Sequence, residues 1–207
     1  VTDITLRWDV GARRLLSKNA RNVVVQNSGY QGSTAWVSPS PHYPSYVPDV
    51  GVQAVLERYR AAAAPLIEKP VGGLLAAVTR QTAASGESAL GNLVADAQLW
   101  ATQAAEAGGA QISFMHAGGL RADLLPDAQG QLRYGQLFAV QPFGNHLVVQ
   151  TLSGAQIRAL LEQQFALPLA ASQRSRVLSV SQGFGYAYDL SQPPGKRVGA
   201  ITLHGQA

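Results

Sequence analysis

The sequence contains no cysteine. A disulfide-stabilised scaffold, a zinc site built on thiolates and a cysteine nucleophile are therefore all excluded. It also lacks any run of about 18 consecutive apolar residues, the length that a membrane-spanning helix requires, although 46% of its 207 residues are hydrophobic. No segment near its start combines a charged region with an apolar one, as a secretory signal does. These features favour a globular chain with a core the size of one domain or slightly more.

Charged residues are few and do not cluster. They make up 14% of the sequence, with 16 basic against 12 acidic side chains and a net charge of +4. Most of the basic residues are arginine, whose planar guanidinium suits phosphate and carboxylate recognition, although a bias for Arg over Lys also arises without a functional reason. Because no basic run or stripe is present, we expect no binding to nucleic acid.

The four histidines give no sign of a metal site. His42, His116, His146 and His204 follow no ligand-like spacing, and no acidic residue lies three or four positions from any of them. The scattered acidic residues likewise offer no candidate pair for acid–base hydrolysis. We therefore expect this chain to bind no metal ion or other cofactor and to hold no catalytic residue of its own.

The first part of the chain predicts short strands, an ordered loop and a helix. Alternation of apolar and polar residues over Thr2–Val10 indicates a strand with one buried face, and Val23–Val25 is a second strand candidate. Four prolines and several aromatic residues indicate an ordered loop over Gly29–Pro48. Asp49 then caps a helix with apolar residues at helical spacing, which Pro65 ends or bends.

We divide the chain into residues 1–49, a connecting helix over 50–69, and a domain over 70–207, because the composition shifts to Ala, Gly and Leu after the helix. Strands and helices alternate irregularly in this domain, which predicts an α+β fold with a mixed β-sheet and packed helices. The expected strands are Val71–Thr79, Gln111–Met115, His146–Leu152, Val177–Val180, Tyr186–Leu190 and Val198–Leu203. The expected helices are Ser88–Glu106 and one that Ser153 opens in a capping box with Gln156, while Tyr134–Val140 is expected to be irregular or a single turn.

The start of the long helix permits two interpretations. Ser88 is a typical N-cap, and Asn92 and Asp96 share one helix face, where other parts of the fold can satisfy them. A helix N-terminus also attracts anions, so a phosphate could bind there. The pattern alone favours the structural interpretation.

A Gly-Gly loop follows the expected buried strand that ends at Met115. Gly118 and Gly119 would let a ligand approach the backbone closely, and Arg121 just beyond could pair with a phosphate or a carboxylate. A tight turn with a solvated arginine explains the same residues, and the pattern does not decide between the two.

A second loop contains an aromatic residue beside an amide. Phe143 and Asn145 flank a glycine, from which they could stack on a base and hydrogen-bond to it. A phenylalanine in such a loop more often fills a core, so the pattern alone favours packing.

The chain contains, in this order, the segments ESALGNLVADA, FMHAGGLRADL and QPFGNHLVVQTLSGAQIRALLEQ. Together they resemble the C-terminal domain of the 5'-nucleotidase and UDP-sugar hydrolase family, over about Val71–Ala207, and the three motifs at these spacings are jointly specific. The resemblance implies that residues 1–49 are the end of an N-terminal metallophosphatase domain, that 50–69 connect the domains, and that the C-terminal domain at 70–207 is truncated at its end.

In that family the N-terminal domain holds two divalent metal ions and the attacking water, and the C-terminal domain presents the nucleotide to them. The resemblance implies an intact protein that hydrolyses nucleoside 5'-monophosphates or nucleotide sugars in nucleotide catabolism, with Zn²⁺, Mn²⁺ or Mg²⁺ in a domain outside this chain. The chain by itself is then expected to be inactive. Its expected partners are the nucleotide and its own metallophosphatase domain, and its expected location is the periplasm or the cell exterior.

The resemblance also assigns site residues one by one. Arg121 matches the arginine that binds the substrate phosphate. Phe143 matches one of two aromatic residues that enclose the base, and Asn145 lies beside it. Gly118 and Gly119 match the glycines of the family's N-x-G-G-x-R loop.

Other positions are less regular. Gly183 lies in the segment that lines the base pocket in relatives. His116 replaces the asparagine of the loop, so a hydrogen bond there depends on the tautomer and charge of an imidazole. Ala84 stands where relatives carry another phosphate-binding arginine, and Arg80 is a candidate substitute. The second stacking aromatic would follow Ala207.

Two alternatives stay open. The departures at His116 and Ala84 also fit a non-catalytic binding or scaffold module that keeps the fold. The substrate could equally be another ester, such as a 2',3'-cyclic nucleotide, because the loops that choose the substrate cannot be matched.

Overall fold

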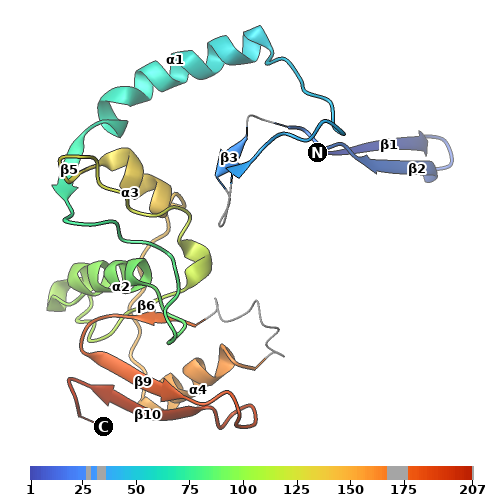
Figure 1. Ribbon diagram of the computed structural model, residues 1–207. Coiled ribbons are helices and arrows are strands. Elements are labelled where there is room, and N and C mark those ends of the chain that lie inside the picture. The colour runs from blue at the N-terminus through green and yellow to red at the C-terminus, as the bar shows by residue number, and fades with distance from the viewer. Residues whose placement is uncertain (27–28, 32–35, 167–176, 207) are drawn as a thin grey trace. The chain divides into compact units, whose positions relative to one another are not determined.

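The computed structural model describes residues 1–26, 29–31, 36–166 and 177–206. Contacts within the chain divide it into two units, Val1–Ala62 and Ala63–Ala207, and each is described by itself. Figure 1 shows their helices and strands. In the described residues, no helix is both long and apolar enough to cross a membrane.

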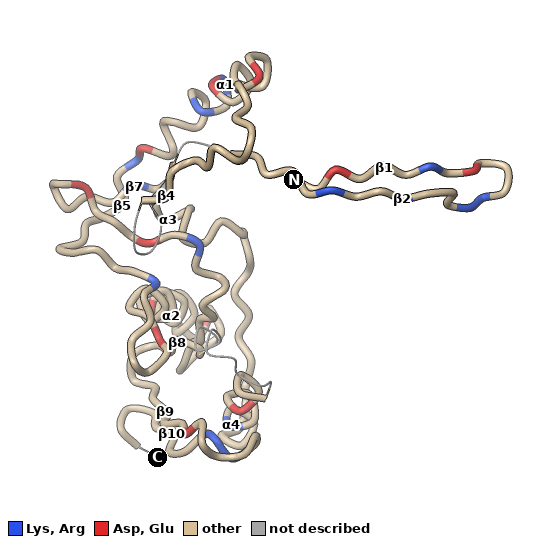
Figure 2. Tube along the Cα trace, turned by 45° about the vertical axis from the view of Figure 1, so that its right-hand side comes forward, with Lys and Arg blue, Asp and Glu red and all other residues tan. Residues whose placement is uncertain are grey.

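The smaller unit begins with a β-hairpin. Strand β1 (Thr2–Asp9) pairs antiparallel with β2 (Arg14–Asn22), as Figure 1 shows, which confirms the strand expected there. The expected buried face is wrong, because the apolar side chains of β1 are exposed. Val23–Val25 lies beyond the end of β2 and forms no strand, so that prediction is wrong. Both strands of the hairpin contain charged residues (Figure 2). The sequence of β2 does not alternate between apolar and polar residues, so no periodic pattern marks it as a strand.

Two very short strands and a helix follow. Strands β3 (Tyr30–Gln31) and β4 (Trp36–Val37) pair antiparallel within the segment expected to be an ordered loop.

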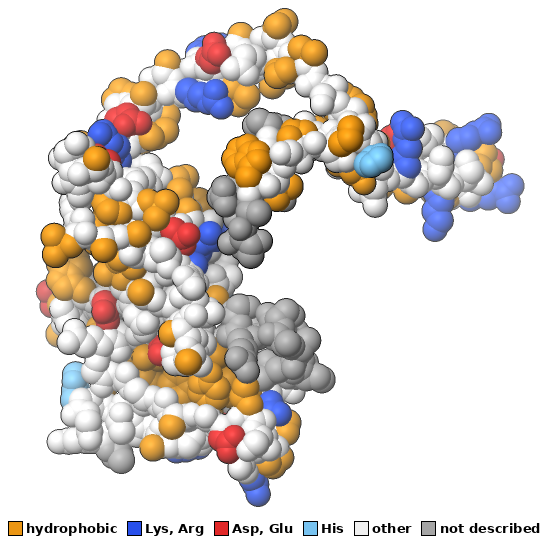
Figure 3. Space-filling view, in the orientation of Figure 1, with side chains coloured by type: hydrophobic (Ala, Val, Ile, Leu, Met, Phe, Trp, Pro, Cys, Tyr) orange, Lys and Arg blue, Asp and Glu red, His pale blue; other side chains and the backbone are white. Residues whose placement is uncertain are grey.

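Helix α1 (Val50–Ile67) crosses the boundary between the two units, and the Asp49 carboxylate caps it by accepting a backbone hydrogen bond of 2.9 Å from its first turn. Pro65 lies in its last turn and does not end it. No residue of α1 is buried, and Figure 3 shows hydrophobic side chains along it.

The larger unit combines helices with two-stranded antiparallel sheets. Its helices are α2 (Ala89–Thr102), α3 (Tyr134–Val140) and α4 (Gly154–Gln163), with 3₁₀ turns η1 (Ala105–Ala107) and η2 (Ala117–Gly119). Its strands pair as β5 (Pro70–Gly73) with β7 (Gln131–Arg133), β6 (Phe114–Met115) with β8 (Ser179–Val180), and β9 (Phe184–Tyr188) with β10 (Val198–Leu203). The α+β class is confirmed. The described strands pair in twos, however, and not in the single mixed sheet that we expected.

Elements marked by local signals begin where the sequence predicts. Ser88 is the N-cap of α2, and its Oγ accepts the backbone N–H of Gly91 at 3.0 Å. Ser153 and Gln156 form the expected capping box of α4, with the Ser153 N–H donating to Gln156 Oε1 at 2.8 Å. Strand β10 spans the predicted residues. Each of these signals acts between residues close in sequence, which explains why it could be recognised.

Other predicted strands are absent or much shorter, and those over Gln111–Met115 and Val177–Val180 shrink to the two residues of β6 and of β8. His146–Leu152 forms no strand, because alternation marks a face but does not supply a partner, and no other described strand pairs with it. In Val71–Thr79 only the first residues belong to β5. Val78, farther along, makes a single bridge with Leu124.

The segment expected to be irregular or a single turn is the seven-residue helix α3. Gln136 supports its start, because its Oε1 accepts the backbone N–H of Arg133 at 2.8 Å and its Nε2 donates to the carbonyl oxygen of Leu125. The first bond satisfies an N–H group at the start of the helix that would otherwise lack a partner, and the second ties the helix start to Leu125. The helix ends at the buried residue Val140.

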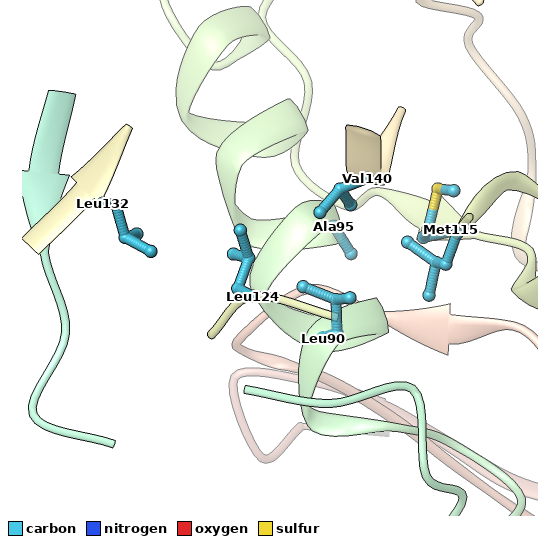
Figure 4. Close-up of a cluster of buried hydrophobic side chains, with 7 residues drawn as sticks. Leu90, Ala95, Met115, Leu124, Leu132 and Val140 are labelled. Atoms are coloured by element: carbon cyan, nitrogen blue, oxygen red, sulfur yellow. The ribbon is translucent and has the colours of Figure 1, made fainter. Parts of the chain in front are cut away.

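Buried hydrophobic residues form two clusters in the larger unit. The first consists of Leu90, Ala95, Met115, Leu120, Leu124, Leu132 and Val140, most of which are labelled in Figure 4. The second is built around α4 and the β9–β10 pair and consists of Leu161, Phe165, Val177, Val180, Phe184 and Val198. Burial of such side chains is the main source of stability for a fold whose sheets are this small.

Candidate functional site

The Gly-Gly loop and the Phe143 turn both leave the first hydrophobic cluster. Met115 directly precedes His116, Leu120 precedes Arg121, and Val140 ends α3 just before the turn; all three are buried. Figure 4 shows Met115 and Val140 on the same cluster as Leu90 and Ala95 of α2. Packing of these residues therefore fixes where the two loops start.

Backbone hydrogen bonds join three segments that are far apart in sequence. The Arg121 N–H donates to the Val140 carbonyl oxygen at 2.9 Å, which ties the Gly-Gly loop to the end of α3. Val78 and Leu124 exchange two backbone bonds of 2.9 Å each, which ties the segment before Arg80 to the same loop. The structure thus brings together the segments of Arg80, Arg121 and Phe143.

Arg121 is exposed, and its side chain curls toward its own loop. Its Nη1 donates to the carbonyl oxygen of Gly118 at 3.3 Å. The remaining guanidinium donors make no hydrogen bond within the part of the chain that the structure describes. They can bind an oxyanion without losing a protein partner.

Arg80 lies against the backbone of Arg121. Its Nη1 donates to the Arg121 carbonyl oxygen at 3.1 Å, and its Nε pairs with Asp123 Oδ1 at 3.0 Å. The Arg80 backbone N–H also donates to Asp123 Oδ1, at 2.8 Å. This backbone bond, followed by the guanidinium, holds the pKa of Asp123 below its ordinary value of 3.8, although partial burial opposes it.

The sequence analysis did not identify Asp123. The contact joins residues 43 positions apart, and no local spacing rule reports a pair at that separation. The signal available was an acidic residue two positions after Arg121, in a chain with few acids.

His116 is exposed and packs on its own loop. A Cβ atom at Gly118 would lie 3.3 Å from His116 Nδ1, and one at Gly119 would lie 3.1 Å from Nε2 and 2.5 Å from the Met115 methyl group. Both glycines therefore make room for neighbouring side chains of the loop, and Gly119 is itself buried.

Phe143 and Asn145 lie in the turn after α3. The Phe143 side chain is 50% exposed, so it does not fill a core, which the pattern alone had favoured. Gly144 between them has a φ of +62°, a conformation that glycine adopts without strain. The turn thus presents an aromatic ring and an amide at the surface, three and five residues after the anchored Val140.

Gly183 lies between β8 and β9. Its carbonyl oxygen accepts the His204 N–H at 2.6 Å, and a Cβ atom placed on it would come within 2.7 Å of the His204 ring. The preceding residue, Gln182, donates its N–H to Asp96 Oδ1 at 2.6 Å, which anchors this turn to α2. Among the described residues, Gly183 takes no part in the hydrogen bonds that join the segments of Arg80, Arg121 and Phe143.

Polar residues at the start of α2 bind the backbone of β8. Glu87 Oε1 accepts the Val180 N–H at 3.1 Å, and Asn92 Nδ2 donates to the Val180 carbonyl oxygen at 2.9 Å. At the helix N-terminus, the Leu90 N–H donates to the Thr79 carbonyl oxygen at 3.1 Å. The residues of this motif are therefore engaged structurally, as the sequence pattern favoured, and the N–H groups of Leu90 and Gly91 already have protein partners.

Metal ligands do not gather in the described residues. No group of three or more His, Asp or Glu side chains there is placed to hold a metal ion. The residues present do not fit the two divalent metal ions that the resemblance implies, and no step is assigned to a metal in this chain.

The anchored arginines and the exposed phenylalanine define a domain suited to binding an organic phosphate. The chain belongs to the 5'-nucleotidase family: the model of the 5'-nucleotidase C-terminal domain matches residues 65–207. This match confirms the resemblance drawn from the three motifs.

Several known proteins are similar to this chain. Endonuclease YhcR of Bacillus subtilis is 30% identical over 142 residues, which make up 69% of this chain and 10% of YhcR. Trifunctional nucleotide phosphoesterase protein YfkN of the same organism is 34% identical over 124 residues, or 60% of this chain and 8% of YfkN. The chain therefore spans about a tenth of the length of these relatives.

A solved structure supports the same assignment. The 5'-nucleotidase precursor from Thermus thermophilus superposes with a TM-score of 0.62 and 28% sequence identity, over 98% of this chain and 35% of that protein. The matched region is a small part of these longer proteins, of which one is named a nucleotide phosphoesterase and another a 5'-nucleotidase precursor.

Proposed function

We propose that this chain binds the substrate of a 5'-nucleotidase-type phosphoester hydrolase, a nucleoside 5'-monophosphate or a nucleotide sugar. Arg121, with Arg80 beside it, receives the phosphate, and Phe143 stacks on the base with Asn145 hydrogen-bonding at its edge. The observation that carries the proposal is the 2.9 Å bond from Arg121 to Val140, which holds the phosphate-binding and base-binding segments at one place.

The proposal extends to the rest of the assembly. Hydrolysis takes place in a metallophosphatase domain of the full-length protein, which supplies two divalent metal ions and to which residues 1–49 belong. Residues 50–69 connect that domain to the substrate-binding domain over 70–207. His116, Gly118, Gly119 and Gly183 shape the pocket walls. The chain alone is inactive, and the full-length protein acts in nucleotide catabolism in the periplasm or outside the cell.

The binding role can be tested on the chain itself by NMR titration, which detects weak complexes. We expect adenosine 5'-monophosphate to perturb the amide signals of the Gly-Gly loop and the Phe143 turn. Arg121→Ala should weaken its binding by about tenfold or more, the effect of losing a charge-assisted contact. Phe143→Ala should weaken binding of the nucleotide but not of inorganic phosphate.

A matched control is Arg158→Ala. Arg158 is another exposed arginine whose Nη1 donates to backbone carbonyl oxygens, those of Val198 and Gly199, outside the three site segments. Unchanged nucleotide affinity in Arg121→Ala, or an equal loss in Arg158→Ala, would remove the phosphate assignment. Hydrolysis by the full-length protein with Mn²⁺ or Zn²⁺, tested on nucleoside monophosphates, nucleotide sugars and 2',3'-cyclic nucleotides, identifies the substrate class. No hydrolysis of any of them would favour a binding module.

A further inference from the structure

One carboxylate oxygen holds Arg80 at two points. Asp123 Oδ1 accepts both the backbone N–H of Arg80, at 2.8 Å, and its Nε–H, at 3.0 Å. Because both donors belong to the same residue, the carboxylate fixes the course of the Arg80 backbone and the direction of its side chain together. We propose that Asp123 is a positioning residue, which holds the Arg80 guanidinium beside Arg121 so that two arginines receive the substrate phosphate.

The placement of Asp123 follows from the backbone. Val78 and Leu124 form an isolated antiparallel bridge, and their reciprocal hydrogen bonds of 2.9 Å set the register between the two segments. Leu124 is buried in the first hydrophobic cluster, and Val78 packs against the same cluster. This register brings Arg80, two residues after Val78, against Asp123, one residue before Leu124.

Two hydrogen bonds hold the guanidinium of Arg80, and other N–H donors of this group stay available to a ligand. Nε binds Asp123, and Nη1 donates to the Arg121 carbonyl oxygen at 3.1 Å. A guanidinium has five N–H donors, and Nη2 of Arg80 makes no hydrogen bond to any described residue. An arginine held in this way loses little side-chain entropy when it binds an oxyanion, so its remaining donors contribute more to affinity.

The exposure of the pair argues for orientation as its role. The Arg80 and Asp123 side chains are 45% and 33% exposed, and ion pairs with this access to water contribute little to folding stability. The Asp123 carboxylate offsets the charge of the Arg80 guanidinium, which lies against the carbonyl oxygen of Arg121. The three charges leave a site with one net positive charge, which still attracts a phosphate dianion.

This inference rests on the proposed function of the same site, and a double-mutant cycle on the 207-residue chain tests it. Binding of adenosine 5'-monophosphate and of inorganic phosphate is measured for wild type, Arg80→Ala, Asp123→Ala and the double variant. Each single change should weaken phosphate binding by about tenfold, and the double change should cost no more than Arg80→Ala alone. The Asp123→Asn variant keeps an oxygen for the Arg80 N–H and removes the charge, and it should lose part of the affinity with the loop still folded.

Asp127 offers a matched control. It also accepts backbone N–H groups, from Gln129 and Gln131, and pairs with an arginine, Arg133, at 3.7 Å. Asp127→Asn should leave phosphate binding unchanged. The NMR signal of the Arg80 Nε–H gives a second readout, because it should broaden or move in Asp123→Asn even without ligand.

The outcomes separate the two proposals. If wild type binds neither the nucleotide nor phosphate, the proposed function fails and this inference fails with it. If wild type and Arg121→Ala behave as proposed but the Asp123 variants bind like wild type, only the role of Asp123 is overturned. Additive losses in the double variant, or an equal loss in Asp127→Asn, would also overturn it.

Discussion

The backbone N–H of Arg121 donates to the carbonyl oxygen of Val140 at 2.9 Å. This bond joins a loop that carries a guanidinium to a helix end that carries an aromatic turn, and both start from one hydrophobic cluster. The geometry of the candidate site is therefore coupled to core packing. Changes in the core and at close-packed glycines test that coupling.

The first prediction concerns the close contact of α2 with β8. A Cβ atom at Gly91 would lie 2.7 Å from the Ser179 Cβ, so Gly91→Ala overpacks the contact and should lower the free energy of unfolding by about 1 to 3 kcal/mol. Gly154→Ala is the control, because nothing lies within 4 Å of its Cβ position in α4, and there alanine should be neutral or stabilising. Chemical denaturation measures the free energy of unfolding of both variants. Equal changes would show that helix propensity, and not the contact with Ser179, determines the effect of the alanine.

The second prediction separates backbone strain from crowding at Gly183. Gly183 and Gly195 have nearly the same φ, +88° and +85°, so alanine is strained at either position. Only Gly183 also faces a side chain, the His204 ring at 2.7 Å from its Cβ position. Gly183→Ala should therefore destabilise the fold by about 1 kcal/mol or more beyond Gly195→Ala, and His204→Ala should recover part of that difference. Thermal unfolding of the variants is the measurement; no recovery would remove His204 as the cause.

The third prediction concerns alkaline pH. Burial raises the pKa of Tyr186 from 10.0 to about 12, against the opposing effect of its hydrogen bond with Gln164. A raised pKa in the folded state adds stability that is complete below pH 10 and is lost as the pH rises toward about 12. Tyr186→Phe should remove this part of the pH dependence. Tyrosinate absorbance should show one of the seven tyrosines titrating late, and a uniform titration of all seven in the folded protein would contradict the assignment.

The fourth prediction concerns acid pH. The pKa of Asp123 is lowered below 3.8, chiefly by the Arg80 backbone N–H. Its contribution to stability is therefore present above pH 3.8 and is lost as the pH falls through the lower, folded-state pKa. In the Asp123→Asn variant, the free energy of unfolding should depend less on pH in that acid range. Its dependence on pH in the alkaline range should be unchanged. Denaturation curves at several pH values test this, and Asp123→Asn curves parallel to wild type would refute it.

Local signals were enough to predict several elements, since each depends on residues close in sequence. The Ser88 cap, the Ser153 capping box and the extent of β10 are of this kind. Strand β2 could not be predicted, because its sequence does not alternate between apolar and polar residues. His146–Leu152 shows the converse, a strand-like pattern without a strand.

The candidate site was predictable to a similar degree. The family resemblance pointed to Arg121 and Phe143, and to Arg80 only as a substitute, whereas the loop patterns alone left the role of Arg121 open and favoured packing for Phe143. Asp123 was missed because its role depends on a bridge between Val78 and Leu124 that no spacing rule reveals. A pairing between distant segments has to be seen in three dimensions.

Both backbone hydrogen-bonding groups of Arg121 have partners, the N–H at Val140 and the carbonyl oxygen at Arg80. These two main-chain bonds hold the loop at this position, and the side chain adds one more, from its Nη1 to the Gly118 carbonyl oxygen at 3.3 Å. A substitution of the Arg121 side chain therefore leaves both main-chain hydrogen bonds of the loop in place.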